Sequence, residues 1–161
     1  MNSAFPKDWK ALLILWGIVS PDLLLYNCQM DVIADTNIFI AVALNEPEKD
    51  NIIQLTAEAS VLAPEILPYE IGNALSAMVK RGKLTGSEAL KAEKLANRIP
   101  VRLVGVDVQA SLQIALEHNI YAYDAYFLQC AQEFARPLLT LDQRMKQVAS
   151  LLGINRLEES P

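Results

Sequence analysis

Short apolar segments that suit β-strands alternate with helical patterns along most of the chain, and this alternation restricts the fold more than any other feature. The strand-like segments lie at 31–34, 61–63, 101–106, 138–140 and 154–157. Helical patterns separate them at 38–44, 47–59, 67–81, 85–99, 108–117, 123–135 and 143–152. Strands separated by helices pair in parallel, and the helices then cover both faces of the sheet. The sequence therefore predicts an α/β fold with right-handed crossovers.

Residues 1–29 differ from this pattern. Ala11–Val19 is an apolar run, but it is too short to span a bilayer, which requires about 20 residues. Leu23–Gln29 contains no convincing small-residue cleavage site for a signal peptide. We expect Met30 to be the true start and residues 1–29 to be an upstream extension; a weak membrane or partner contact is the alternative. Residues 30–161 then form one domain, for which no membrane association is expected.

Charge and cysteine content exclude several classes of protein. The net charge is −5 and the isoelectric point is near 4.9, so the chain lacks the basic character common in nucleic-acid-binding proteins. An acidic site loaded with metal ions would offset part of that charge. Cys28 and Cys130 lie far apart without a CxxC spacing, which argues against a disulfide scaffold or a zinc knuckle and suits a reducing cytoplasm. The single histidine, His118, excludes mechanisms that need two histidines.

Four acidic residues interrupt or end apolar segments: Asp35, Glu70, Asp124 and Asp142. Apolar segments normally lead into a core, where an unpaired carboxylate is costly unless another charge neutralises it. No equally regular set of Lys or Arg accompanies these acids. In an open parallel sheet, the carboxyl ends of the strands and the starts of the following helices share one edge. We therefore expect the four carboxylates to meet there around Mg²⁺ or Mn²⁺, which prefer oxygen ligands.

Helix capping is the alternative explanation for single members of this set, because acidic side chains are favoured at helix N-termini. Taken alone, Asp124 and Asp142 fit capping better than metal binding. Glu70 does not fit it, because a capping box requires Ser or Thr at the position that Leu67 occupies. Asp35 also resists this explanation, since two further polar residues follow it directly after a buried strand. The ordered set is far more specific than any of its members.

Clustered carboxylates raise one another's pKa, and a cation allows them to ionise together. One or two divalent ions would relieve that repulsion, make a water molecule nucleophilic and stabilise the charge that develops on a phosphate. We assign Asp35 and Asp124 to direct coordination, and Glu70 to coordination or to activation of the attacking water. Asp142 would complete the shell directly or through water. Asn73 lies three residues after Glu70 on the same helix face, where it could orient Glu70 or a metal-bound water.

The ordered segments MDVIADTN (30–37), EIGN (70–73), YDA (123–125) and TLD (140–142) resemble those of PIN domains, especially VapC-type ribonuclease toxins. The resemblance covers residues 30 to about 157. It implies a three-layer α/β/α sandwich with a central parallel sheet of about five strands, and metal-dependent endoribonuclease activity. In the family's terms the metal-binding acids would be Asp35, Glu70 and Asp124, with Asp142 as a fourth of more variable role.

The same resemblance implies further features. The supporting polar residues would be Thr36, Asn37, Asn73 and Thr140. Members of the family often form homodimers, and a small antitoxin encoded nearby commonly silences them. The leader at residues 1–29 departs from the family pattern.

An RNA substrate requires basic side chains near the acidic edge, because phosphate affinity is largely electrostatic. Arg144 and Lys146 closely follow the last of the four acids and are the nearest candidates. Lys80 and Arg81 belong to the tightest basic cluster, although a solvated helix end explains them better. The aromatic residues at 121, 123, 126 and 127 could stack on bases, but we expect at least half of them to belong to the core or to a dimer interface.

Two other functions compete with this interpretation. A Mg²⁺-dependent phosphohydrolase of the haloacid-dehalogenase kind needs a second Asp two residues after its nucleophile, but Asn37 occupies that position after Asp35. A catalytically silent interaction module that keeps a PIN-like fold is the second alternative, and the presence of all four acids argues against it. The sequence contains no GxGxxG, P-loop or HExxH pattern, which removes dinucleotide, nucleoside-triphosphate and zinc-protease functions.

Overall fold

The computed structural model describes residues 30–158. Four parallel strands form its central sheet in the order β3-β2-β1-β4. They are β1 (Met30–Ala34), β2 (Ala59–Pro64), β3 (Arg102–Val104) and β4 (Leu138–Leu139). In the register of the sheet, Val32 pairs with Val61 on one side of β1, and Ile33 pairs with Leu138 on the other. The strand that Asp35 directly follows therefore lies in the interior of the sheet.

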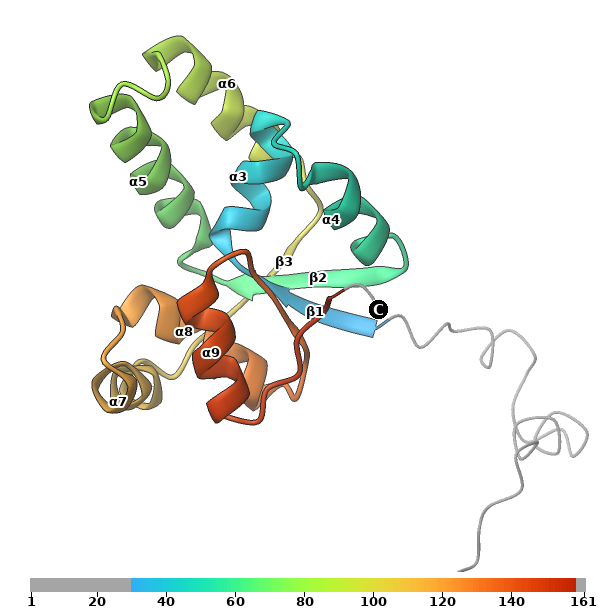
Figure 1. Ribbon diagram of the computed structural model, residues 1–161, viewed down its shortest axis with the longest axis vertical. Coiled ribbons are helices and arrows are strands. Elements are labelled where there is room, and N and C mark those ends of the chain that lie inside the picture. Colours follow the sequence, from blue (N-terminus) through green and yellow to red (C-terminus); the bar gives the residue numbers. More distant parts are fainter. Residues whose placement is uncertain (1–29, 159–161) are drawn as a thin grey trace, which may run out of the picture.

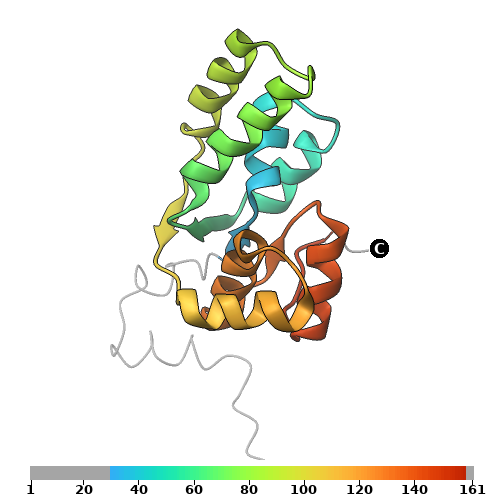
Figure 2. The same ribbon diagram turned by 90° about the vertical axis from the view of Figure 1, so that its left-hand side faces the viewer.

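Seven helices in the described part of the chain cover the two faces of this sheet (Figure 1, Figure 2). One face carries α3 (Thr36–Leu44), α4 (Lys49–Thr56), α5 (Leu67–Lys80) and α6 (Gly86–Ala96). The other face carries α7 (Val108–His118), α8 (Ala122–Glu133) and α9 (Gln143–Leu151). These layers confirm the predicted α/β/α sandwich with a parallel sheet.

The sheet has four strands where about five were expected, because the last expected strand, 154–157, forms only one bridge. That bridge joins Leu138 to Arg156, and two backbone hydrogen bonds support it. Both measure 2.9 Å and run from Leu138 N to Asn155 O and from Leu157 N to Leu138 O. β4 is only two residues long, so it offers few further partners to a neighbouring strand. Thr140, which follows it, joins a polar network instead of the sheet.

Capping and strand pairing set the helix boundaries. α3 begins at Thr36, two residues before its predicted start, because the Asp35 side chain accepts a hydrogen bond from Thr36 N and caps the helix. α4 ends at Thr56 rather than at Ala59, because Ala59 pairs with Met30 in the sheet. Both boundaries are set by contacts outside the helix itself, and the helical period of the sequence contains no information about such contacts.

α8 provides the centre of the hydrophobic core. Its residues Phe127, Leu128 and Cys130 are fully buried, and the helix packs against β1 and β2. Burial raises the pKa of the Cys130 thiol to about 12, so this cysteine is an inert core residue. Because the core extends to the ends of β1 and β4, the polar residues that follow these strands lie at the border between core and solvent.

No helix within residues 30–158 is long and apolar enough to cross a membrane. The expectations about residues 1–29, including the apolar run and Cys28, fall outside the described residues.

Candidate active site

Asp35 lies at the carboxyl end of β1, where it forms the N-cap of α3. The residue is 6% exposed, and its carboxylate accepts hydrogen bonds from Thr36 N at 2.6 Å, the Thr140 hydroxyl at 2.6 Å and the Asn37 amide at 2.5 Å. Burial outweighs these bonds and raises the pKa of Asp35 from 3.8 to about 7, and two neighbouring carboxylates add to the increase. Without a compensating cation, this side chain is therefore partly protonated at neutral pH.

Glu70 is linked to Asp35 through one threonine. The Thr36 hydroxyl donates to Glu70 Oε2 at 2.6 Å, so α3 holds a carboxylate of α5 beside the end of β1. Burial raises the pKa of Glu70; the bond from Thr36 opposes this, and Asp124 adds to the increase. α5 begins with Pro68 in its first turn and without a capping side chain, so Glu70 is not needed for a cap.

Asn37 and Thr140 tie the end of β1 to the end of β4, although they lie 103 residues apart. The Asn37 amide donates to Thr140 Oγ1 at 3.2 Å, and its carbonyl accepts from Leu141 N at 3.1 Å. Thr140 also donates to Asp35 and accepts from Asp142 N at 3.0 Å. These two predicted supporting residues thus fix the direction of the Asp35 carboxylate.

Asp124 and Asp142 extend the acidic edge from the other helical layer. Asp124 lies in the first turn of α8, and Asp142 caps α9 by accepting from Met145 N at 2.8 Å. Burial raises the pKa of Asp124; Asp142 adds to the increase, and a backbone hydrogen bond from Tyr121 opposes it. Asp142 therefore does cap a helix, as the alternative explanation proposed. The cap uses only its Oδ1 atom, so the other carboxylate oxygen is available to a ligand.

Within residues 30–158, no ion pair neutralises the four acids. The pairs that form there use other carboxylates, those of Asp31 and Glu158. No three Asp, Glu, His or Cys side chains in the same part of the chain converge closely enough to hold one ion as they stand. The donor set nevertheless suits a hard divalent cation, because it offers carboxylate oxygens and three of the four pKa values are raised.

Several residues predicted to serve the site lie away from these acids. Asn73 is exposed on α5 and takes no part in the bond that holds Glu70. Lys80 and Arg81 lie at the end of α5, about 15 Å along the helix axis from Glu70. Lys146 forms an ion pair at 3.9 Å with a carboxylate near the C-terminal end of the described chain.

Arg144 does lie at the acidic edge, in a recess of about 480 Å³. The recess is lined by Asn119, Ile120, Tyr121, Asp124, Asp142 and Arg144. Sequence reasoning missed Asn119 and Ile120, because the recess depends on the left-handed turn at Asn119 (φ 51°, ψ 54°) that ends α7. An Asn at a helix end is the only sequence signal of such a turn.

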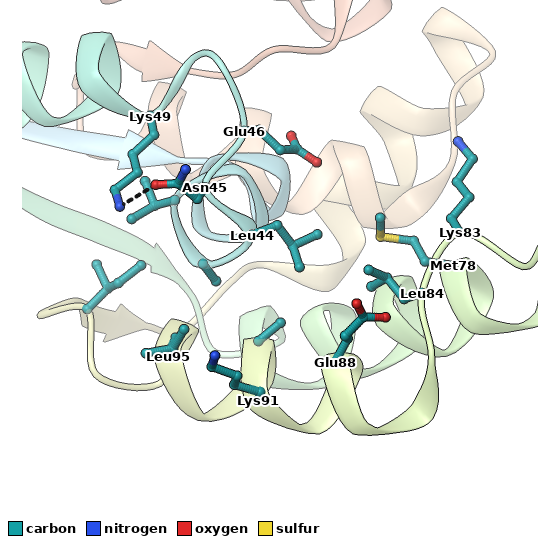
Figure 3. A pocket seen from close by; sticks show the side chains of 14 residues that line it. Leu44, Asn45, Glu46, Lys49, Met78, Lys83, Leu84, Glu88, Lys91 and Leu95 are labelled. Carbon is teal, nitrogen blue, oxygen red and sulfur yellow. Dashed lines mark hydrogen bonds between the residues drawn. The ribbon is translucent and has the colours of Figure 1, made fainter.

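A larger cavity, of about 750 Å³, lies between the C-terminal end of α3 and the pair α5 and α6 (Figure 3). Leu44, Met78, Leu84 and Leu95 give it apolar walls. Side chains of both charges surround them, and they are Glu46, Lys49, Lys83, Glu88 and Lys91. The four acids do not line this cavity, so its chemistry is distinct from that of the acidic edge.

Comparison with known proteins places this geometry in a family. The family model described as PIN domain matches residues 32–151. The solved structure of PAE2754 from Pyrobaculum aerophilum is 21% identical with a TM-score of 0.57, over 80% of this chain and 93% of that chain. VapBC2 from Rickettsia felis, solved bound to a DNA fragment from their promoter, is 16% identical with a TM-score of 0.57, over 80% of this chain and 98% of that chain.

At these identities the two solved structures show a shared fold and nothing more. No curated protein matches the chain. The family match spans β1 to the end of α9 and includes all four acids. The chain therefore belongs to the PIN domain family.

Proposed function

We propose that this protein is an endoribonuclease that uses Mg²⁺ or Mn²⁺ to hydrolyse RNA phosphodiester bonds. The observation that supports this most directly is the electrostatic coupling of Asp35, Glu70 and Asp124, each of which has a raised pKa. Carboxylates that are penalised by burial and by one another, without an internal cation in the described chain, are stabilised when a divalent cation binds between them. Such a cation can also draw together side chains that repel one another in its absence.

The residues divide the work by their positions. Asp35 and Asp124 would coordinate the cation, and the second oxygen of Asp142 would complete its shell. When bound, the ion lowers the pKa of a water molecule and stabilises negative charge on the phosphate. Glu70 would ligate the ion or accept a proton from the attacking water, and its raised pKa makes it a stronger base than an ordinary glutamate. Thr36 holds Glu70 in place for either role.

We further propose that the protein is the toxin of a type II toxin–antitoxin pair of the VapBC kind. The fold shared with VapBC2 supports this assignment. The cavity at the C-terminal end of α3 supports it as well, because its apolar walls suit the apolar face of a helix from a small antitoxin (Figure 3). The charged residues around the walls would pair with charges on that segment.

A homodimer would cover an apolar stripe on α7. Val108, Leu112 and Leu116 recur every four residues along this helix, and all three are exposed. This spacing places them on one side of the helix. Monomeric proteins rarely leave a contiguous large apolar patch uncovered, so a second copy of the chain is the partner we propose for this stripe.

Cleavage of single-stranded RNA by the purified protein tests the ribonuclease function. We expect cleavage with Mg²⁺ or Mn²⁺, none in EDTA, and a loss of more than about 100-fold in Asp35→Asn. Asp31→Asn is the matched control, because Asp31 lies on the same strand but pairs with Arg102 and Arg136 instead of joining the acidic edge. Cleavage that persists in EDTA or in Asp35→Asn would contradict the proposal. A silent interaction module would cleave under none of these conditions.

A further inference from the structure

The recess beside Asp124 and Asp142 contains an aromatic ring that the proposed metal chemistry does not use. Tyr121 is 82% exposed, so its ring contributes little to packing within the described chain. Its backbone carbonyl accepts a hydrogen bond from Ala125 N at 3.2 Å, which fixes the residue at the N-terminal end of α8. A large exposed ring at a fixed position beside a polar site offers a flat surface to a ligand.

The same recess contains the guanidinium group of Arg144, which a hydrogen bond holds in place but no ion pair within the described residues neutralises. Arg144 Nη2 donates to the backbone oxygen of His118 at 2.5 Å, which engages one of the five donors of the guanidinium. Asp124 and Asp142 also line the recess, yet within residues 30–158 Arg144 forms an ion pair with neither. The remaining donors of this planar group are therefore available to a phosphate.

The size of the recess fits a ligand that carries a ring, and its guanidinium fits a phosphate of that ligand. Its volume of about 480 Å³ falls within the usual range of small-molecule sites, about 300–1,000 Å³. Two of its lining residues, Tyr121 and Asp142, are the N-caps of α8 and α9. Carboxylates already occupy both helix ends, with Asp142 capping α9 and Asp124 in the first turn of α8, so Arg144 is the group in this recess that meets the charge of a phosphate.

We infer that this recess binds the unpaired nucleotide next to the scissile phosphate, with its base stacked on Tyr121 and a phosphate on Arg144. The inference rests on the proposed ribonuclease function and adds the two residues that hold the substrate strand beside the acids. A base inside a duplex is already stacked on its neighbours, whereas an unpaired base can stack on an aromatic side chain. The recess thus places the strand beside the carboxylates that act on it.

Fluorescence anisotropy with a short labelled single-stranded RNA in EDTA measures binding apart from cleavage. We expect Tyr121→Leu and Arg144→Ala each to weaken binding by about tenfold, while Tyr121→Phe, which keeps the ring, binds like the wild type. Arg144→Ala should also reduce the slope of log affinity against log salt by about 0.7, because one phosphate contact is lost. Arg98→Ala is the matched control, since this exposed arginine follows α6 on the other face of the sheet.

An abasic nucleotide, placed in turn at each position around the cleavage site, locates the stacked base. We expect one position where removal of the base costs as much as Tyr121→Leu, and where combining the two changes causes no further loss. Additive losses at every position would overturn the stacking contact.

The outcomes separate this inference from the proposed function. If the wild type cleaves RNA but both variants bind and cleave like Arg98→Ala, the recess assignment is wrong and the nuclease function stands. If the wild type does not cleave RNA yet binds it through Tyr121 and Arg144, the recess assignment stands and the nuclease function fails. If the wild type does not bind single-stranded RNA at all, the recess assignment is overturned.

Discussion

At the scale of single residues, the surroundings of Asp35 set its charge. Three hydrogen bonds favour the carboxylate, but burial outweighs them and places its pKa at about 7. The native protein therefore retains a proton that the unfolded chain, with a pKa near 3.8, has already lost. Between about pH 4 and about pH 7, we expect this group to reduce the stability of the metal-free protein as the pH rises, by up to about 4 kcal/mol.

Asp35→Asn should remove this pH dependence. In EDTA we expect the melting temperature of the wild type to fall between about pH 4 and about pH 7, and that of the variant to change less. At about pH 8 the variant should be as stable as the wild type or slightly more so, because it lacks the buried charge. Mn²⁺ should then raise the melting temperature of the wild type more than that of the variant. Circular dichroism melts, with and without Mn²⁺, measure all three effects.

Two results would assign Asp35 a structural role instead. One is a large loss of metal-free stability in Asp35→Asn at about pH 8. The other is an equal rise in melting temperature with Mn²⁺ in both proteins.

Single residues also show where sequence reasoning succeeds and where it stops. Asp35 and Glu70 could be identified because an acid that directly follows an apolar strand or helix start has few structural explanations. The hydrogen bond from Thr36 to Glu70 could not be predicted from the sequence, because it depends on how α3 crosses α5. The helical period correctly placed Asn73 one turn after Glu70. It could not show that the Asn73 side chain faces solvent instead of the site.

At the scale of elements, the site is a joint between the end of β1 and the end of β4. Asn37 and Thr140 form this joint, and Thr140 is 4% exposed. The backbone hydrogen bond from Asp35 N to Leu139 O, at 3.0 Å, extends the pairing of the two strands up to the acid itself. A change in the joint should therefore affect both the stability of the sheet and the charge of Asp35.

Thr140→Val should reduce the free energy of unfolding by about 1–3 kcal/mol, because it removes a buried hydroxyl from three hydrogen bonds. It should also raise the pKa of Asp35 further, since the bond from Thr140 lowers that pKa. Denaturant unfolding and a carboxyl titration followed by NMR measure the two effects. Thr56→Val is the matched control: its hydroxyl donates only to Ile52 O within α4, so we expect a smaller loss and no change at Asp35. Equal effects of both variants would show that the joint has no special role in the stability of the sheet or in the pKa of Asp35.

The elements also differ in how far the sequence determines them. The starts of α6, α7 and α9, which capping side chains mark, were predicted within one residue, and a capping box of Thr85 and Glu88 begins α6. The extent of a strand depends on its neighbours in the sheet, which periodicity does not reveal. For this reason segment 154–157 was expected as a full strand, whereas only Arg156 makes a bridge to the short β4.

At the scale of the whole molecule, the proposed partners use separate surfaces. The cavity for an antitoxin segment lies among α3, α5 and α6, and the stripe for a second copy lies on α7. The helices of the cavity and the helix of the stripe are on opposite faces of the sheet (Figure 1, Figure 2). Neither surface includes the four acids. A dimer and a bound antitoxin can therefore exist together, and each can be disrupted without the other.

Two leucine variants test this separation, and each is the control for the other. Leu116 is 75% exposed and Leu95 is 38% exposed, so a charge at either position should leave the fold intact. Native mass spectrometry of the protein isolated from its own cells should reveal two copies of the chain with a small partner. We expect Leu116→Glu to lose the dimer but keep the partner, and Leu95→Glu to lose the partner but keep the dimer. A monomeric wild type, or identical effects of the two variants, would contradict these assignments.

The joint between Asp35 and Thr140 spans 105 residues of sequence, and it includes one of the last segments of the domain to be synthesised. A nascent chain that has not yet released this segment from the ribosome cannot hold the carboxylate of Asp35 in place. Under the proposed ribonuclease function, such late assembly would delay activity until synthesis is nearly complete and so protect the ribosome-bound message that encodes the protein.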